Sequence, residues 1–466
     1  MTAPLALTDL GRVHLLGLGG VGVSGVARLL AARGVEVSGT DAVDSPTLHR
    51  LAELGIRTCV GHDPANLADL GPGDTLVVSS AVRDGNPELV AARERGLRVL
   101  HRSQALAALM AGRRGVAVAG THGKTTTTSM LAVALVAAGL DPSYAIGGEI
   151  TGGTDGGARD GSGPFVAEAD ESDGSFREYA PLVDVVTNVE PDHLDHYGTA
   201  EAYTAAFDEF VARLQPGGLL VACADDVGSA ALADRARARG VRVRTYGTSA
   251  TADVVLRDVR LGTAPSATLD DGTGARSLHL AVPGEHNLRN AAAAWTTAVE
   301  LGADPDAVLA GLATFGGARR RFELKGEAGG VRVVDDYSHH PTEVEALLRA
   351  ARPVAGDGRV VAVFQPHLVS RTRTFAREFG QALALADEVV VLDVYVARED
   401  PDPAVTGALV ADAVPLGAEH VRFVPDLQDA TGVLVDLVRP GDLLLTVGAG
   451  NVTTLGPQVL DALGRR

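Results

Sequence analysis

The sequence has little of what marks several other classes of protein. Two cysteines occur among 466 residues, Cys59 and Cys223, and they match neither a disulfide framework nor a zinc site, so both read as buried thiols. Residues 1–10 carry no Lys or Arg ahead of an apolar core, which argues against a signal peptide. The apolar stretch near residues 130–140 is shorter than the about 18 residues that a membrane span needs. We therefore expect a soluble cytoplasmic protein without a membrane partner.

Basic residues are also in short supply. Lys and Arg total 41 against 59 Asp and Glu, which gives a formal charge of −18, and no basic stripe is evident. Nucleic acid is therefore a disfavoured partner. At roughly 150 residues per domain the length predicts about three domains. Abundant Ala, Gly and Val with only 4% aromatic residues suits tightly packed α/β layers.

Three segments in series alternate predicted strands with predicted helices, which is typical of α/β domains with mainly parallel sheets. We place the domains at residues 1–111, 112–318 and 319–466. Residues 254–282 suggest a short β addition, and residues 151–163 an exposed loop. Strands are predicted at 13–17, 35–41, 75–79, 97–100, 116–119, 165–169, 183–188, 331–335, 359–364, 388–392, 420–424 and 442–447.

The run Gly120-Thr-His-Gly-Lys-Thr-Thr126 lies between an apolar strand and a helical stretch. A glycine turn that opens a helix aims backbone N–H groups at an anion, and the helix dipole adds to the attraction. Lys124 can then reach terminal phosphates, and the Thr125 hydroxyl can bind Mg²⁺. Only two residues separate the glycines, so this is a shortened phosphate loop; an ordinary strand-to-helix turn is the alternative.

A second glycine turn, Gly17-Leu-Gly-Gly-Val-Gly22, follows the first predicted strand, and Asp41 ends the second. This spacing satisfies the dinucleotide-binding fingerprint, in which glycines approach a pyrophosphate and an acid approaches a ribose. UDP also contains a pyrophosphate and a ribose. The fingerprint therefore indicates a diphosphate nucleotide and does not single out NAD.

Polar clusters follow several predicted strands, where ligands bind in parallel sheets. Glu168 and Asp170 can hold a Mg²⁺ that bridges phosphates, and His193 can serve a second cation site. Asn287 and Asn290 share one helical face and could contact a nucleotide, although helix capping by Asn287 is a rival explanation. Spacing alone assigns no role to three further polar segments, residues 319–322, 335–343 and 364–372. The first lies at a predicted domain boundary, where an arginine can reach a γ-phosphate when domains close.

Together these motifs resemble the Mur ligases, and among them the members that add L-alanine to UDP-N-acetylmuramate. The matching segments keep the family's order over nearly the whole chain: 17–25, 120–126, 168–173, 187–193, 286–290, 320–322, 335–343, 364–367 and 448–451. The resemblance implies a Rossmann-like UDP-binding domain, a central P-loop ATPase, and a C-terminal Rossmann-like domain that binds the amino acid and closes on ATP.

The resemblance also implies the chemistry. ATP would phosphorylate the lactyl carboxylate of UDP-N-acetylmuramate, and the amine of L-alanine would attack the acyl phosphate, in peptidoglycan precursor synthesis. The implied cofactors are ATP and two Mg²⁺ ions, with Mn²⁺ as an alternative. Because a carboxylate must attack an anionic phosphate, the site needs several cations.

Roles carry over from the family residue by residue. Lys124 and Arg321 would stabilise the transferring phosphoryl group, Thr125 and Glu168 would hold one metal ion, and His193 would help hold a second. The ATP site would comprise Gly120, Thr121, His122, Gly123, Lys124, Thr125, Thr126, His286, Asn287, Asn290, Arg321 and Asp336. Tyr337, His339, His367 and Arg371 would face the amino acid and the reacting carboxylate, with His339 and Arg371 counted as catalytic. Gly17, Gly20, Val21, Gly22, Asp41 and Ser79 would line the UDP moiety.

The sequence departs from the family pattern at two places near the expected amino-acid site. Ser338 stands where members usually have glycine, and Leu368-Val369 replaces a more basic and aromatic stretch. The central domain shows no lysine suited to carbamylation, which fits the alanine-adding members.

Four other functions remain to be weighed. A sister ligase that adds a recycled tripeptide shares most motifs but needs a wider amino-acid site, and a folyl-polyglutamate synthetase lacks the unit from Gly17 to Asp41. An NAD-dependent dehydrogenase would leave the phosphate loop and Glu168 unexplained. A nucleotide sensor without catalysis would not need Lys124, Thr125, Glu168 and His193 together.

Overall fold

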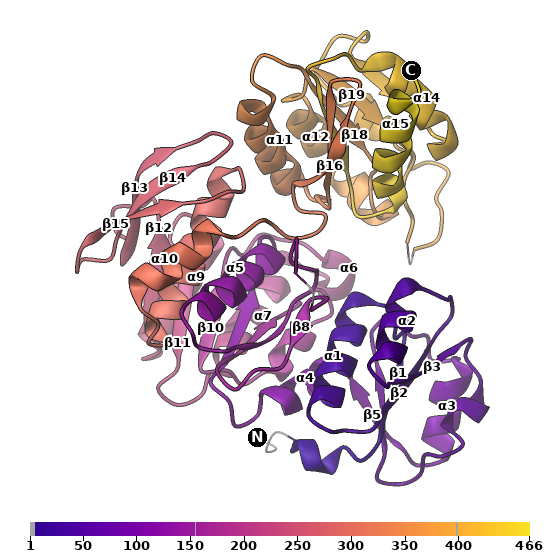
Figure 1. The fold of residues 1–466 in the computed structure, drawn as a ribbon, viewed down its shortest axis with the longest axis vertical. Coiled ribbons are helices and arrows are strands. Elements are labelled where there is room, and N and C mark those ends of the chain that lie inside the picture. Colours follow the sequence, from indigo (N-terminus) through magenta and orange to yellow (C-terminus); the bar gives the residue numbers. More distant parts are fainter. Residues whose placement is uncertain (1–4, 154, 398) are drawn as a thin grey trace. The chain divides into compact units, whose positions relative to one another are not determined.

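The chain forms three α/β domains in series, each built on its own sheet (Figure 1). The structure, a computed structural model, describes residues 5–153, 155–397 and 399–466. By its internal contacts the chain divides into two compact units, the first made of residues 1–257, 268–278 and 289–314 and the second of residues 258–267, 279–288 and 315–466. Within the described residues, no helix combines the length and apolar character needed to cross a membrane.

The first domain contains a five-stranded parallel sheet in the order β3-β2-β1-β4-β5. Its strands are β1 (Val13–Leu16), β2 (Val37–Asp41), β3 (Arg57–Val60), β4 (Thr75–Val78) and β5 (Arg98–His101), and its helices α1 (Val21–Ala32), α2 (Pro46–Glu53), α3 (Pro87–Glu94) and α4 (Arg102–Met110). The chain order reverses between β1 and β4. At such a reversal the loops after the strands leave a crevice at the carboxyl edge of the sheet, where ligands bind.

The second sheet has ten strands in the order β15-β14-β13-β12-β11-β10-β6-β9-β7-β8. The strands are β6 (Gly115–Ala119), β7 (Ser143–Ala145), β8 (Ala158–Arg159), β9 (Phe165–Glu168), β10 (Val183–Val186), β11 (Leu219–Cys223), β12 (Arg242–Gly247), β13 (Val254–Arg260), β14 (Ser266–Asp270) and β15 (Ala275–His279). The helices are α5 (Lys124–Ala137), α6 (Leu194–Tyr197), α7 (Ala200–Val211), α8 (Val227–Ala238), α9 (Glu285–Glu300) and α10 (Pro305–Ala313). Strand β6 lies between β10 and β9 and is parallel to both, so the loops after the three strands meet at one edge.

One hydrophobic core serves both the first and the second sheet. It includes Leu29 of α1 and Leu109 of α4 from the first domain, and Phe165 and Phe176 from the second, each at most 1% exposed. Burying large apolar side chains of both domains in a single cluster is the main force that holds them together. The first domain and most of the second accordingly belong to one compact unit.

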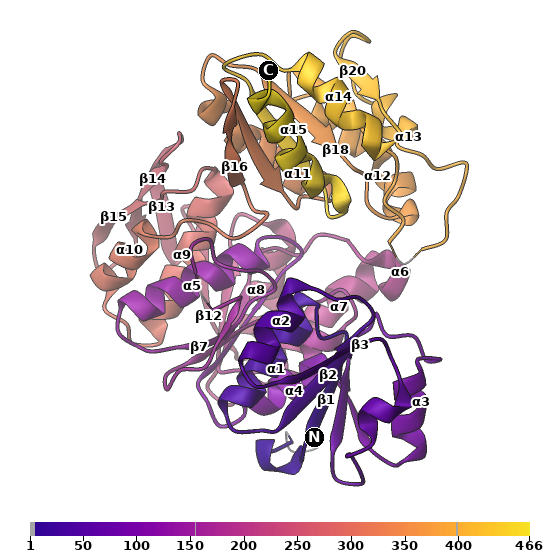
Figure 2. The same cartoon turned by 45° about the vertical axis from the view of Figure 1, so that its right-hand side comes forward.

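The third domain has a six-stranded sheet in the order β16-β17-β21-β18-β19-β20, parallel except for the β16–β17 pair. The strands are β16 (Glu323–Ala328), β17 (Val331–Asp336), β18 (Val360–Phe364), β19 (Glu388–Val391), β20 (Val421–Phe423) and β21 (Leu443–Val447), and the helices α11 (Pro341–Ala355), α12 (Val369–Leu383), α13 (Ala408–Ala411), α14 (Leu427–Leu437) and α15 (Leu455–Gly464). Alternate residues of β18 enter different cores, Ala362 with α11 and α12 and Val361 with α14 and α15. Helices thus cover both faces of this sheet (Figure 2).

The predicted α/β class and three-domain organisation are confirmed, and all twelve predicted strands are present within a few residues. Two local predictions were wrong. Cys59 is only half-buried, because β3 is the edge strand of its sheet. Of the predicted exposed loop 151–163, in which residue 154 lies outside the described residues, Ala158 is buried because β8 packs against α1.

Candidate active site

The first glycine turn joins β1 to α1 at the carboxyl edge of the first sheet. Gly17 has a positive φ of 76°, and the N–H of Gly20 donates to its carbonyl at 3.0 Å. The N–H of Gly19 donates to Asp41 Oδ2 at 2.8 Å, so the acid at the end of β2 closes the turn. Helix α1 then begins without a capping side chain and without an acidic residue in its first turn. The backbone N–H groups of this helix terminus are therefore available to an anion.

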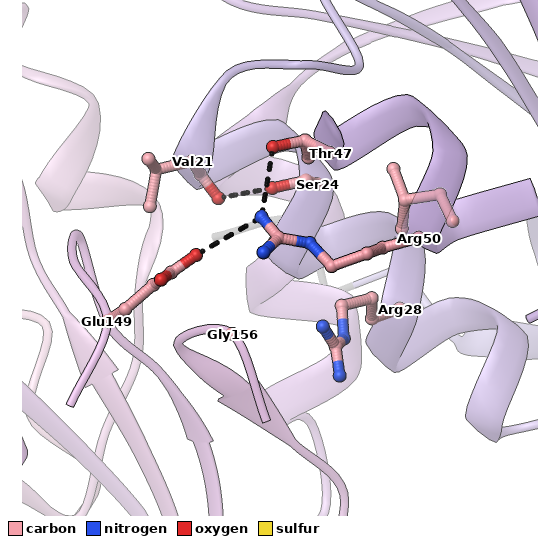
Figure 3. Close-up of a pocket in the computed structure, with 8 residues that line it drawn as sticks. Val21, Ser24, Arg28, Thr47, Arg50, Glu149 and Gly156 are labelled. Atoms are coloured by element: carbon pink, nitrogen blue, oxygen red, sulfur yellow. Dashed lines mark hydrogen bonds and ion pairs between the residues drawn. The ribbon is translucent and has the colours of Figure 1, made fainter. Parts of the chain in front are cut away.

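A hollow lies beside this turn, between the first domain and the second (Figure 3). Arg50 of α2 reaches across it to Glu149, with 3.4 Å between Nη2 and Oε1. The Ser24 hydroxyl donates to the carbonyl of Val21 at 3.0 Å. The lining residues are Val21, Ser24, Arg28, Thr47, Arg50, Leu51, Glu149 and Gly156. Two arginines and one glutamate give it a polar, net basic character.

The second glycine turn, residues 120–123, joins β6 to α5, and its first and last positions accommodate only glycine. Gly120 and Gly123 have φ of 131° and 81°, values that other residues rarely adopt. A Cβ on Gly120 would lie 2.1 Å from Thr187 Oγ1, and a Cβ on Gly123 would lie 2.9 Å from Asn290 Oδ1. The turn is thus closely surrounded by the strand end after β10 and by α9. This is the strand, turn and helix arrangement that a phosphate loop requires.

Lys124 is held by a buried carboxylate. Its Nζ lies 2.8 Å from Oε2 of Glu171, whose side chain is completely buried, and it also donates to the carbonyl of Gly120 at 2.7 Å. Burial by itself lowers the pKa of Lys124, but the negative charges of Glu171 and Asp170 outweigh it and raise the pKa above its usual value. Lys124 is therefore a permanent cation at the first position of α5.

Thr125 and Glu168 bring two hard oxygen donors together. The Thr125 hydroxyl donates to Glu168 Oε1 at 3.0 Å, and the N–H of Gly147 donates to Oε2 at 2.7 Å. Burial raises the pKa of Glu168, although the charge of Lys124 and these two hydrogen bonds oppose the rise. A buried carboxylate of this kind favours a bound cation, and oxygen ligands suit Mg²⁺. The donor set therefore fits the magnesium ion that the sequence predicts.

His193 adopts a left-handed backbone conformation, with φ of 53°, just before α6. Its Nε2 lies 3.6 Å from Glu171 Oε1 and 3.6 Å from Asp192 Oδ2. Its Nδ1 is buried and has no hydrogen-bond partner among the residues that the structure describes. An imidazole beside two carboxylates is a donor set that suits a divalent cation such as Mn²⁺.

In the second unit, a tight turn at residues 320–322 meets the end of β17. Arg320 and Phe322 both have positive φ, 58° and 49°, and the N–H of Phe322 donates to Asp336 Oδ2 at 2.7 Å. Burial raises the pKa of Asp336, although the charge of Arg321 opposes the rise. Both the N–H and the hydroxyl of Ser338 donate to Asp336 Oδ1, so this serine caps the acid.

His339 is a neutral imidazole in a crowded polar environment. Burial lowers its pKa to about 3, and the charge of Arg371 adds to the effect against the opposing charge of Glu343. Its Nδ1 lies 3.0 Å from the carbonyl oxygen of Tyr337. A carbonyl oxygen can only accept a hydrogen bond, so the proton of the neutral ring is on Nδ1. Nε2 therefore carries the free lone pair and can accept a hydrogen bond from a ligand.

His367 lies between His339 and Tyr395. Its ring centroid is 5.9 Å from each, and its plane is nearly parallel to that of Tyr395, at 15°. Arg371 Nη1 lies 3.4 Å from His367 Nδ1. Leu368 has a positive φ of 71°, and its N–H donates to the carbonyl of Tyr395 at 3.0 Å. The loop after β19 is therefore fastened to the loop after β18.

The site residues predicted from the sequence fall into two sets. The first unit brings Gly17, Gly20, Val21, Gly22, Asp41 and Ser79 to the carboxyl edge of the first sheet, and Gly120, Thr121, His122, Gly123, Lys124, Thr125, Thr126, Glu168, His193 and Asn290 to that of the second. The second unit contains His286, Asn287, Arg321, Asp336, Tyr337, His339, His367 and Arg371. Within α9, Asn287 Nδ2 donates to the carbonyl of Pro283 at 2.7 Å, so part of its side chain serves the helix start.

Three side chains that sequence reasoning passed over contact these clusters: Glu171, Tyr395 and Arg102. Glu171 lies in the acidic run after β9, where only its neighbours Glu168 and Asp170 had been singled out. Arg102 follows β5 at the same edge as the first glycine turn, which is a positional signal that could have identified it. Nothing in the sequence marks Tyr395.

Comparison with known proteins covers almost the whole chain. Residues 12–114 match the catalytic domain of the Mur ligase family, residues 118–298 match the Mur ligase middle domain, and residues 320–450 match the glutamate ligase domain of Mur ligases. These three ranges follow the three sheets in order.

Individual relatives are similar over their full length. The UDP-N-acetylmuramate--L-alanine ligase of Kineococcus radiotolerans is 82% identical over 98% of this chain and 97% of its own. The crystal structure of a UDP-N-acetylmuramate-alanine ligase from Thermotoga maritima matches with a TM-score of 0.81 and 31% identity, over 97% of this chain and 98% of that chain. A murein peptide ligase from Psychrobacter arcticus matches with a TM-score of 0.71 and 25% identity, over 98% and 99% of the two chains.

Proposed function

The chain belongs to the Mur ligase family: it is an ATP-dependent ligase that joins L-alanine to UDP-N-acetylmuramate in peptidoglycan synthesis, and we propose that its residues do so through an acyl phosphate. A lactyl carboxylate oxygen attacks the γ-phosphorus of ATP, and the bond to the ADP oxygen breaks. The alanine amine then attacks the acyl carbon, phosphate leaves, and an amide forms. The full-length identity of 82% to an L-alanine ligase supports this reaction most directly.

Lys124 and the loop 120–126 would bind the terminal phosphates of ATP. The support is geometric: the turn leads into α5, and Lys124 is a permanent cation at the first position of that helix. Phosphate oxygens would then replace Glu171 as partners of Nζ, because each offers a comparable charge-assisted hydrogen bond. Arg321 would add a second positive charge to the transferring phosphoryl group, and His286, Asn287, Asn290 and Asp336 would line the rest of the nucleotide.

Thr125 and Glu168 would hold one Mg²⁺, and His193 would help hold a second ion, Mg²⁺ or Mn²⁺. The support is the 3.0 Å contact between the two oxygen donors and the buried His193 Nδ1 without a described partner. A bound divalent ion would neutralise phosphate charge and so allow an anionic carboxylate to approach. The carboxylate of Glu168 is held in a fixed direction, because the N–H of Gly147 donates to its second oxygen, Oε2.

The first domain, residues 1–111, would bind the UDP moiety. Gly17, Gly20, Val21 and Gly22 would present backbone N–H groups to the diphosphate, and Asp41 and Ser79 would face the ribose and the crevice. The uncapped start of α1 supports this role.

Residues 112–318 would form the ATP-binding domain. Because ATP and UDP-N-acetylmuramate are both nucleotides of the cell interior, we place the reaction in the cytoplasm.

Residues 319–466 would bind L-alanine. The neutral His339 can accept a hydrogen bond from the amine at Nε2, since its Nδ1–H is occupied by the Tyr337 carbonyl. Arg371 would pair with a carboxylate, and Tyr337 and His367 would border the amino acid. Ser338 and Leu368 are buried against their own loops, which is why the departures from the family pattern are compatible with an L-alanine site.

Phosphate release from MgATP and UDP-N-acetylmuramate tests the proposal, with L-alanine, glycine, L-serine or the tripeptide L-Ala-γ-D-Glu-meso-diaminopimelate added in turn. We expect the greatest kcat/KM with L-alanine and a product heavier by one alanine residue. Turnover with the tripeptide alone would instead identify a recycling ligase. Nucleotide binding without turnover by any acceptor would indicate a sensor.

A further inference from the structure

Arg102, the first residue of α4, lies between the first glycine turn and the acidic run of the second domain. A Cβ placed on Gly22 would be 3.2 Å from Arg102 Nη1, so the guanidinium lies directly against the first turn of α1. On its other side Nη2 donates to Asp170 Oδ2 at 2.7 Å. One side chain thus contacts both halves of the first unit.

The guanidinium is an enclosed and permanent cation. The side chain of Arg102 is 19% exposed. Burial alone lowers its pKa, but the charges of Asp170, Tyr179 and Asp173 outweigh burial and raise the pKa above the usual value. The carboxylate oxygen Oδ2 of Asp170 lies 2.7 Å from Nη2 of this guanidinium. Asp170 thereby fixes the direction of the guanidinium.

Most hydrogen-bonding capacity of this guanidinium is still available. Arginine has five N–H donors, and within the described chain Arg102 makes only the one hydrogen bond to Asp170. Its Nη1 faces a helix start whose first turn contains no acid. A doubly charged diphosphate at that turn would accept hydrogen bonds from the helix N–H groups and from Nη1 together.

Arg33 shows what a purely structural arginine between the same two domains looks like. Its Nε and Nη2 both donate to Asp160 Oδ1, at 2.9 and 2.8 Å, and its Nη1 donates to the carbonyl of Leu109 at 2.6 Å. Its guanidinium also lies over the ring of Phe165. With 15% exposure it is buried like Arg102, yet its donors are committed to protein groups.

We propose that Arg102 is a substrate-binding residue that contacts the diphosphate of the UDP-sugar, with Asp170 as its positioning residue. The proposal rests on the proposed function, because it assumes that the first glycine turn binds UDP. It adds a side-chain cation to a subsite otherwise made of backbone N–H groups. Asp170 also links this subsite to the strand end that contains Glu168.

Titration calorimetry on the full-length protein tests the proposal, with Arg102→Met, Arg102→Lys and the matched control Arg33→Met. The probes are UDP, UDP-N-acetylglucosamine, which lacks the lactyl group, and UDP-N-acetylmuramate. We expect Arg102→Met to weaken all three by on the order of 10- to 100-fold, the effect of losing a charge-assisted hydrogen bond. Arg102→Lys should recover part of the affinity, and Arg33→Met should bind UDP within about twofold of the wild type, since a contact outside the subsite adds nothing to binding.

Three outcomes would overturn the proposal. Equal losses in Arg102→Met and Arg33→Met would make both arginines structural, and their thermal unfolding midpoints would report the shared cause. Weakened binding of UDP-N-acetylmuramate alone would assign Arg102 to the lactyl carboxylate. Unchanged affinity for every probe would remove Arg102 from the site. If the wild type binds UDP but shows no ligase turnover, the proposed function fails while the role of Arg102 stands.

Discussion

Lys124 and Glu171 form a buried ion pair at the heart of the phosphate loop, with 2.8 Å between Nζ and Oε2. The glutamate is completely buried and the lysine is 15% exposed. The pair therefore keeps the lysine charged and in place before any nucleotide arrives. On the proposed role of this loop, ATP binding would exchange one anionic partner of Lys124 for another.

We predict that Glu171→Gln destabilises the protein by about 3 kcal/mol, because it leaves a buried lysine without its counter-charge. MgATP should restore part of this loss, since phosphate oxygens supply the missing anion. Urea unfolding with and without MgATP measures both effects. Glu209→Gln is the matched control, because its pair with Arg177 is exposed and worth little. Wild-type stability in Glu171→Gln would refute the importance of the pair.

Glu168→Gln should lower kcat by on the order of 100-fold or more, because on the proposed assignment it removes a charged metal ligand next to the transferring phosphoryl group. It should also raise the Mg²⁺ concentration needed for half-maximal rate. The raised pKa of Glu168 means that protons compete with Mg²⁺, so the wild-type requirement should increase as the pH falls. Initial rates over a magnesium series at several pH values measure this. The exposed Glu178→Gln serves as control, and an unchanged magnesium requirement in Glu168→Gln would exclude the assignment.

His339 should make the protein less stable as the pH falls. Its folded-state pKa is lowered to about 3, so below the ordinary histidine pKa the unfolded chain binds a proton that the folded chain does not. The free energy of unfolding therefore rises with pH between the folded-state pKa of about 3 and the ordinary histidine pKa of about 6.5, by at most about 1.4 kcal/mol per pH unit. His339→Gln should show a shallower slope between pH 4.5 and 6.5 in denaturant titrations. The exposed His49→Gln should retain the wild-type slope, whereas parallel curves for wild type and His339→Gln would contradict the prediction.

Tyr395→Ala should raise the KM for L-alanine by about five- to tenfold, the equivalent of losing one stacked aromatic pair. The ring of Tyr395 lies parallel to His367, so its removal frees that imidazole to move. The KM values for ATP and UDP-N-acetylmuramate should stay the same, and Tyr395→Phe should behave like the wild type. Phe423→Ala removes an equally exposed ring from β20 of the same unit and controls for general effects. A uniform rise in all three KM values would indicate a structural role only.

Much of the fold and many candidate residues could be predicted because the chemistry lies where strands end. Hydrophobic runs such as Val116 to Ala119 mark buried parallel strands, and the turn after each is short and distinctive. Thr125 and Glu168 were expected to share a metal, and they lie in hydrogen-bond contact. The strands β3, β7, β8, β11, β12 and β16 were not predicted. Of these, β3 and β16 are edge strands with half-exposed residues and no continuous apolar run.

Pairings between distant segments could not be predicted from local pattern. Arg102 meets Asp170 across 68 residues, and Lys124 meets Glu171 across 47. The first contact depends on how two domains pack, and the second depends on the pairing of β6 with β9 within one sheet. No periodicity encodes either arrangement. Likewise, His193 and Leu368 have positive φ angles, which residues with a Cβ disfavour, and only the surrounding structure imposes them.

The common core beneath the first two sheets limits how this protein can be divided or recombined. A fragment ending at residue 111 would expose Leu106, Leu109 and Met110 of α4 to water and would be prone to aggregation. The first domain is therefore not an independent folding unit that could be moved to another protein. Exchange of the first domain between relatives would succeed only if the facing surface of the second domain were transferred with it, so these two domains are constrained to change together.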